Sequence, residues 1–147
     1  MMDYPLTINK KNLRGIMKRP EDVKILVVDD NQAAQEILTY CLRRRGYATP
    51  KIASNGVEAL ALIEKSLKEE NHFDIIFLDI WMPKMEGVET TKRIRQIPSY
   101  KNTPIIAMSA TGIKDDKKMC LEAGATDFIF LPTSLSIYPE KIRKYCQ

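Results

Sequence analysis

Five short apolar runs, separated by stretches with helical spacing, constrain the fold of this chain more than any other feature of its sequence. The runs are KILVV at 24–28, TPKIA at 49–53, FDIIFL at 73–78, PIIAM at 104–108 and DFIFL at 127–131. Three of them are almost unbroken Val, Ile, Leu and Phe, which is typical of strands that helices cover on both faces. The sequence therefore predicts an α/β fold with a doubly wound, five-stranded parallel sheet and helices on both faces.

The stretches between the apolar runs carry the spacing of amphipathic helices. In the first stretch, apolar residues follow the i, i+3, i+4, i+7, i+8 pattern from Ala34 to Leu42, and Gly46 stands where a helix C-cap belongs. Asn55 and Glu58 resemble the capping box that begins a second helix. The remaining helices are expected over 88–94, from 113 to 122 before Gly124, and in a short last segment with Pro139 in its first turn.

The excess positive charge of the chain is confined to its beginning. Residues 1–20 hold five Lys or Arg against Asp3, whereas residues 21–147 hold eighteen charges of each sign. We therefore expect a flexible basic extension over 1–22, followed by one domain over 23–147 that is long enough to bury its own core. Because residues 21–147 are neutral overall, a function in nucleic-acid binding is not expected.

Several classes of protein are disfavoured by what the sequence lacks. No apolar run approaches the roughly eighteen residues of a membrane-spanning helix, and the first twenty residues lack the apolar core of a secretory signal. The three cysteines, Cys41, Cys120 and Cys146, are odd in number and widely spaced, so no disulfide framework is expected. Because His72 is the single histidine, we expect histidine chemistry to come from a partner. The sequence indicates a cytoplasmic protein.

Three acidic residues and one hydroxyl follow the predicted strands. Asp29 and Asp30 come directly after the first strand, Asp79 ends the third and Ser109 ends the fourth. Open parallel sheets carry their functional groups beyond the carboxyl ends of the strands, so we expect these side chains to share one crevice. Clustered carboxylates repel unless a cation intervenes, and an all-oxygen site suits Mg²⁺. The alternative is that Asp30 and Asp79 serve only as backbone caps.

Four segments carry a family resemblance. They are VVDDN at 27–31, DIIFLDIWMPKMEG at 74–87, TPIIAMSA at 103–110 and EAGATDFIF at 122–130. As an ordered set, they resemble a two-component response-regulator receiver domain over residues 23 to about 145. The resemblance implies a flavodoxin-like sheet with strand order 2-1-3-4-5.

The resemblance also implies roles for the acidic residues. Asp79 would be the phosphoacceptor, because a carboxylate beside bound Mg²⁺ can act as a nucleophile toward phosphorus. Asp30 and Asp79 would give carboxylate ligands to Mg²⁺, and Asp29 would act mostly through water. The backbone carbonyl of Trp81 would complete the protein ligands.

The resemblance implies that two further positions carry the expected switch. Ser109 would hydrogen-bond a phosphoryl oxygen, and Phe128 matches the aromatic position that turns inward when that hydroxyl moves. The chain departs from the family at Leu131, just before Pro132, where the family has a lysine that pairs with the phosphoryl group. The nearest other lysines, Lys84 and Lys114, are expected to be solvated surface residues, so no substitute is assigned.

The resemblance implies signalling by phosphoryl transfer rather than enzymatic turnover. A histidine kinase or a histidine phosphotransfer protein would supply the phosphoryl group, and the domain would switch conformation to control protein contacts. No DNA-binding pattern follows the last helix, so we expect output through protein contact. A second hypothesis is an atypical receiver that acts as a weakly switched or constitutive interaction module. A Mg²⁺-dependent phosphohydrolase is disfavoured because Trp81 stands two residues after Asp79, where that class has a carboxylate.

Overall fold

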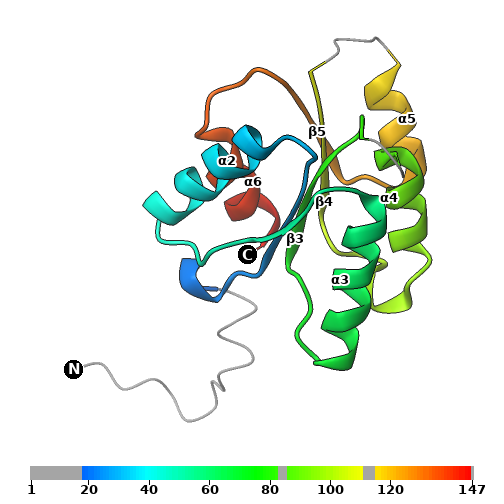
Figure 1. The fold of residues 1–147 in the computed structure, drawn as a ribbon, viewed down its shortest axis with the longest axis horizontal. Coiled ribbons are helices and arrows are strands. Elements are labelled where there is room, and N and C mark those ends of the chain that lie inside the picture. Colours follow the sequence, from blue (N-terminus) through cyan, green and yellow to red (C-terminus); the bar gives the residue numbers. More distant parts are fainter. Residues whose placement is uncertain (1–17, 83–85, 111–114, 147) are drawn as a thin grey trace.

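The computed structural model describes residues 18–82, 86–110 and 115–146, and Figure 1 shows their arrangement. Within these residues the predicted strands pair in parallel, in the order β2-β1-β3-β4-β5. Their bounds are β1 (Ile25–Val28), β2 (Lys51–Ala53), β3 (Ile75–Asp79), β4 (Ile105–Ser109) and β5 (Asp127–Phe130). The predicted fold class and the strand order 2-1-3-4-5 are confirmed.

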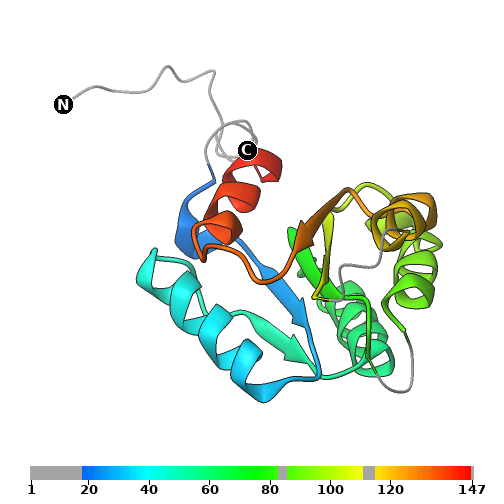
Figure 2. The ribbon, with the colours of Figure 1, turned by 90° about the horizontal axis from the view of Figure 1, so that it is seen from above.

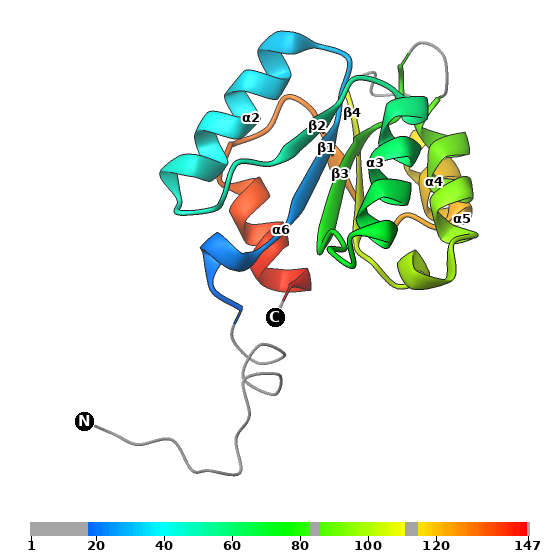
Figure 3. The same ribbon diagram turned by 60° about the horizontal axis from the view of Figure 1, so that its bottom comes forward.

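Helices cover both faces of the sheet. On one face lie α2 (Gln32–Arg44) and α6 (Ile137–Tyr145); on the other lie α3 (Gly56–Lys68), α4 (Gly87–Arg95) and α5 (Asp116–Ala123). Figures 2 and 3 show the sheet between these two layers. The structure also contains two short 3₁₀ helices. These are η1 (Pro20–Asp22), which precedes β1, and η2 (Pro98–Tyr100), which lies between α4 and β4. In the part of the chain that the structure describes, every helix is too short or too polar to cross a membrane.

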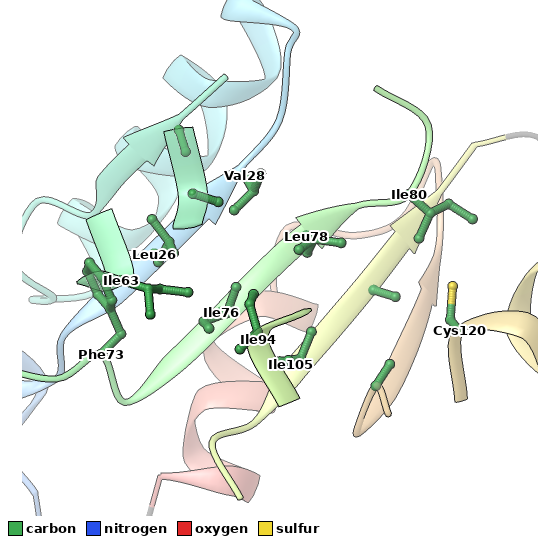
Figure 4. Close-up of a cluster of buried hydrophobic side chains, with 14 of the residues drawn as sticks. Leu26, Val28, Ile63, Phe73, Ile76, Leu78, Ile80, Ile94, Ile105 and Cys120 are labelled. Carbon is green, nitrogen blue, oxygen red and sulfur yellow. The ribbon is translucent and has the colours of Figure 1, made fainter. Parts of the chain in front are cut away.

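Two apolar cores explain why the strand sequences are almost continuously apolar. Successive side chains of a strand point to opposite faces, so Leu26 and Val28 of β1 enter the core beneath α3, α4 and α5 (Figure 4). Ile25 and Val27 enter the core beneath α2 and α6. None of the four is more than 3% exposed. Because helices bury both faces, an apolar side chain is favoured at every position of the strand.

Asparagine side chains cap the first two helices of the layers. Asn31 Oδ1 accepts the N–H of Ala34 at 2.8 Å and begins α2. Asn55 Oδ1 accepts the N–H of Glu58 at 2.9 Å and begins α3. In return, the Glu58 carboxylate accepts the N–H of Ser54 at 2.6 Å, one residue before the cap. The predicted start of the second helix is confirmed.

The last two helices also follow the sequence. α5 ends at Gly124, which adopts a φ of 115° as a left-handed C-cap. Residues 113 and 114, where this helix was expected to begin, lie outside the described residues, and α5 begins at Asp116. α6 begins at Ile137, which places Pro139 in its first turn as predicted. Proline is tolerated there because first-turn N–H groups have no partner within the helix.

Both ends of the described chain reach Asp74, the residue before β3. The Lys18 ammonium lies 2.8 Å from each oxygen of the Asp74 carboxylate, which also accepts the N–H of Lys24 at 2.8 Å. The Cys146 thiol donates to the Asp74 carbonyl at 3.7 Å. Figure 3 accordingly shows η1 beside the C-terminal end of α6. Most of the expected extension over 1–22 lies outside the described residues, so its flexibility stays a prediction.

Candidate functional site

The carboxyl ends of β1 and β3 bring three aspartates together. The two strands are neighbours with Val28 opposite Leu78, so the next residue on each, Asp29 and Asp79, lies at the same edge of the sheet. Asp30 follows directly. Carboxylate oxygens of the three aspartates lie within 4.8 Å of one another. Parallel pairing alone explains this gathering, because it aligns the ends of strands that are distant in the sequence.

Burial makes this aspartate cluster electrostatically unfavourable by itself. Asp29 is 7% exposed and Asp79 is half-buried, whereas Asp30 is exposed. The pKa of Asp79 is raised to about 6, mainly by burial and also by the charges of Asp29 and Asp30, against the opposing effect of the hydrogen bond from the Trp81 N–H. Burial also raises the pKa of Asp29.

The donor set of this cluster fits a small divalent cation. In the described ranges, the ion pairs within 4.0 Å include none of the three aspartates. A cation would therefore relieve a repulsion that these residues leave uncompensated. Carboxylate oxygens, at least one of them open to solvent, are the ligands that Mg²⁺ takes together with water.

The capping alternative fails for one aspartate and holds in part for the other. Asn31, and not Asp30, caps α2 with its side chain. Asp79 Oδ1 does accept the N–H of Trp81 at 3.0 Å, which fixes the orientation of its carboxylate after the strand. Capping of α2 therefore does not explain why Asp30 lies beside the buried Asp29 and the half-buried Asp79.

A buried carboxylate on α5 binds two groups near the aspartate cluster. The Ser109 hydroxyl, at the end of β4, donates to Asp116 Oδ2 at 2.8 Å. The Trp81 indole N–H donates to the same oxygen at 3.1 Å. Ser109 and Asp116 are each 1% exposed, while Trp81 is 41% exposed. One oxygen thus joins the end of β4, the loop after β3 and the first residue of α5.

A sequence model of one family spans nearly the whole fold. The model, described as "Response regulator receiver domain", matches residues 25–143. This chain belongs to the receiver-domain family of two-component response regulators. The family acts in signal transduction, and its members carry an acidic pocket of the kind described above.

Curated relatives of this receiver domain include much longer proteins. It is 35% identical over 131 residues to the sensor histidine kinase RcsC of Escherichia coli, covering 84% of this chain and 13% of RcsC. It is 32% identical over 129 residues to the osmosensing histidine protein kinase SLN1 of Saccharomyces cerevisiae, covering 88% of this chain and 10% of SLN1. The chain thus spans about a tenth of the length of these relatives.

Solved structures of similar sequence share the fold. A putative response regulator from Chloroflexus aurantiacus is 31% identical with a TM-score of 0.76, covering 84% of this chain and 97% of that one. The receiver domain of the sensor histidine kinase PA1611 from Pseudomonas aeruginosa is 27% identical with a TM-score of 0.75, with the same coverages. That structure has a magnesium ion coordinated in its active site cleft.

The aromatic position expected to switch lies inside the receiver domain. Phe128 is 7% exposed and belongs to the core beneath α3, α4 and α5. Its ring contacts that of Phe130 edge to face, with centroids 4.8 Å apart. Phe130 is 55% exposed, so the pair connects the core to the surface of β5.

Leu131 packs against apolar residues. Its backbone N–H donates to the Ser109 carbonyl at 2.8 Å, which extends the pairing of β5 with β4. Its half-buried side chain contacts the core beneath α2 and α6. Lys84 and Lys114 lie outside the described residues.

No role for Asp116 is predicted from the sequence. This residue stands in the charged stretch KDDKK, which reads as a solvated helix start. Its spacing from Ser109 carries no signal of contact, because the loop that joins β4 to α5 sets the geometry. Only the folded chain shows that the Asp116 carboxylate faces inward.

Proposed function

We propose that this receiver domain accepts a phosphoryl group on Asp79 from the phosphohistidine of a histidine kinase or a histidine phosphotransfer protein. The observation that carries the proposal is the gathering of three aspartate carboxylates within 4.8 Å at the carboxyl edge of the sheet. The likeness to two proteins named as histidine kinases supports this class of partner. Phosphorylation would then shift the domain between two conformations and so control its contacts with other proteins.

Mg²⁺ is the cofactor that we assign to this site. Asp30 and Asp79 would be its carboxylate ligands, Asp29 would act mostly through water, and the backbone carbonyl of Trp81 would complete the protein ligands. When bound, Mg²⁺ supplies positive charge to the carboxylates and to the phosphoryl oxygens. The magnesium in the receiver domain of PA1611 supports this assignment.

Asp79 would act as the nucleophile. One of its oxygens forms a bond to phosphorus while the bond between phosphorus and the partner's imidazole nitrogen breaks. The hydrogen bond from the Trp81 N–H holds the Asp79 carboxylate in place for this step. Ser109 would then donate its hydroxyl to a phosphoryl oxygen, and Phe128 would follow its movement. These groups contribute mainly by alignment, which phosphoryl transfer requires.

A second candidate function rests on Leu131. The resemblance of the FIFLP segment implies that the family has a lysine in its place, and the apolar packing of Leu131 supports a position without charge. Without that lysine, the phosphorylated state gains less stabilisation over the unphosphorylated state. The domain would then be a weakly switched or constitutive interaction module.

A labelling experiment tests the proposal. The protein is incubated with Mg²⁺ and a small-molecule phosphodonor such as acetyl phosphate, and covalent phosphate is measured by intact mass and by mapping of the modified peptide. We expect one phosphoryl group on Asp79, none on Asp79→Asn, and slower labelling of Asp30→Asn. Glu64→Gln, which changes an exposed carboxylate on α3, is the matched control and should label like the wild type.

Three other outcomes decide between the candidates. Labelling of Asp79→Asn at the wild-type rate would refute the assignment of the acceptor. Labelling of Asp79 that leaves the NMR resonances of residues around Phe128 unchanged would favour the weakly switched module. Repeated conversion of the donor to inorganic phosphate by catalytic amounts of protein would favour the phosphohydrolase.

A further inference from the structure

The Asp116 carboxylate competes for the hydroxyl that the proposed function assigns to the phosphoryl group. Ser109 donates to Asp116 Oδ2 at 2.8 Å in this structure. A serine hydroxyl carries one proton and so donates to one acceptor at a time. Ser109 therefore has to exchange the oxygen of Asp116 for an oxygen of the phosphoryl group when Asp79 is phosphorylated.

We propose that Asp116 is a positioning residue that holds Ser109 and Trp81 in the unphosphorylated domain, and that its bond to Ser109 opposes phosphorylation of Asp79. This inference rests on the proposed function of Asp79 and Ser109. Besides Ser109 of β4 and Phe128 of β5, the inference adds α5 to the elements that move when Asp79 is phosphorylated. Asp116 acts through Ser109 and Trp81, and it contacts no reacting atom in this arrangement.

The bond to Asp116 is of the strong kind. A carboxylate acceptor makes a hydrogen bond roughly twice as strong as a neutral acceptor does. Both Ser109 and Asp116 are 1% exposed, so water does not compete for either partner. The acceptor also lies on the first residue of α5, which fixes it to the helix rather than to a loop. Breaking this bond is thus a substantial part of the free energy that phosphorylation has to supply.

Trp81 couples the same carboxylate to the proposed metal site. Its indole N–H donates to Asp116 Oδ2 at 3.1 Å, while its backbone N–H donates to Asp79 Oδ1 at 3.0 Å. The residue thus connects Asp116 to the phosphoacceptor through one side chain and one peptide group. When Ser109 leaves, Asp116 Oδ2 loses the donor that Ser109 supplied and keeps the one from Trp81. A buried carboxylate that loses a donor is destabilised in its old position. We therefore place the first turn of α5 among the parts that shift on phosphorylation.

Labelling rates in two backgrounds test the inference. Rates are measured with acetyl phosphate and Mg²⁺ for the wild type, Asp116→Ala, Ser109→Ala and the double variant. We expect Asp116→Ala to raise the rate by about tenfold, which corresponds to about 1.4 kcal/mol of hydrogen bonding lost from the unphosphorylated state. In the Ser109→Ala background, the same substitution should leave the rate within about twofold, because no hydroxyl remains to be released.

A conservative variant guards against loss of the fold. Asp116→Asn keeps the volume and an oxygen acceptor but removes the charge, so it should raise the rate by about threefold. The Trp81 indole N–H resonance provides a readout without labelling. It should move upfield in Asp116→Ala, because a proton that loses its acceptor is less deshielded.

The outcomes separate this inference from the proposed function. If the wild type is not labelled on Asp79, both are overturned. If the wild type is labelled but neither Asp116 variant changes the rate, only the role of Asp116 is overturned. An equal rise in the wild-type and Ser109→Ala backgrounds overturns it too, because a general effect on the fold would act in both. An unmoved indole resonance in Asp116→Ala would overturn the contact with Trp81.

Discussion

Replacing Asp29 by asparagine should change the stability of the domain in opposite directions with and without magnesium. Asp29 is buried beside two other carboxylates, and its Oδ1 accepts the N–H of Asn31 at 2.9 Å. Asparagine keeps the shape of the side chain and this acceptor but removes the charge. Without metal, the substitution relieves a repulsion. With metal, it removes part of the negative charge that attracts the cation.

The size of the effect follows from the spacing of the cluster. At the upper limit of 4.8 Å between these carboxylate oxygens, two unit charges repel by about 3.5 kcal/mol at an effective dielectric constant of 20 and by about 0.9 kcal/mol in bulk water. Because Asp79 is half-buried and Asp30 is exposed, solvent screens the repulsion and we expect a net gain of about 1–2 kcal/mol from Asp29→Asn. For a chain of 147 residues, this corresponds to a rise of about 3–6 °C in melting temperature.

Magnesium should stabilise the wild type by a similar amount. At about ten times its dissociation constant, a ligand that binds only the folded state adds about 1.4 kcal/mol by mass action. The two effects are therefore large enough to be measured separately. We expect Asp29→Asn to gain the stability from relieved repulsion and to lose most of the stability that Mg²⁺ adds.

Scanning calorimetry with EDTA and with millimolar MgCl₂ measures both effects, and the emission of Trp81 reports metal binding. We expect Asp29→Asn to melt above the wild type in EDTA, to gain less from Mg²⁺, and to need more Mg²⁺ for the change in emission. Glu64→Gln is the control for loss of a surface charge. If Asp29→Asn melts below the wild type in EDTA and gains as much from Mg²⁺, the three carboxylates neither repel nor share a cation, and the reasoning is refuted.

Three further predictions concern the lifetime, the missing charge and acid stability. The indole of Trp81 would shield a phosphoryl group on Asp79 from water, so Trp81→Asn should shorten the lifetime of the phosphorylated state. An unchanged rate of loss of the labelled phosphoryl group, measured in a chase with unlabelled donor, would remove the shielding argument. Leu131→Lys should speed labelling by acetyl phosphate. It should also lower the free energy of unfolding in urea by about 1–2 kcal/mol, because a half-buried apolar side chain is lost. An unchanged labelling rate would mean that another cation fills the role of the family's lysine. Burial acts to raise the pKa of Asp127, but hydrogen bonds from Lys141 at 2.6 Å and Tyr145 at 2.7 Å outweigh it and lower the pKa to about 2. Asp127 therefore contributes stability above about pH 4 that is lost as the pH falls toward 2, and urea unfolding of Asp127→Asn should show a smaller loss over that interval.

The fold was predictable because each level of the sequence points to the same answer. Strands such as β1 must be apolar on both faces when helices cover both, and this leaves an unbroken apolar run in the sequence. The gathering of Asp29, Asp30 and Asp79 was predictable for a topological reason. Parallel strands end at a common edge, so residues that follow two neighbouring strands meet whatever their separation along the chain.

Details that depend on loops and on the orientation of single side chains were not predictable. Asp30 and Asn31 are both good helix caps by type, and the geometry of one peptide unit decides that Asn31 caps α2. Asp116 stands among lysines and a second aspartate, so its pattern is that of a solvated helix start. Its burial depends on how the chain passes from β4 to α5, which no periodicity in the sequence encodes.

The two ends of the described part of the chain meet at Asp74, and this suits the domain to insertion into other proteins. Lys18 and Cys146 both contact Asp74, which precedes β3, whereas the aspartate cluster lies at the opposite end of that strand. A unit whose ends emerge side by side can be inserted into a loop of a host without stretching either connection. Neighbouring modules joined at these ends would leave the aspartate cluster accessible to a docking protein. The position of these ends thus suits a domain that forms one segment of a longer protein. This agrees with the similar segments found in relatives about ten times longer than the segment that matches.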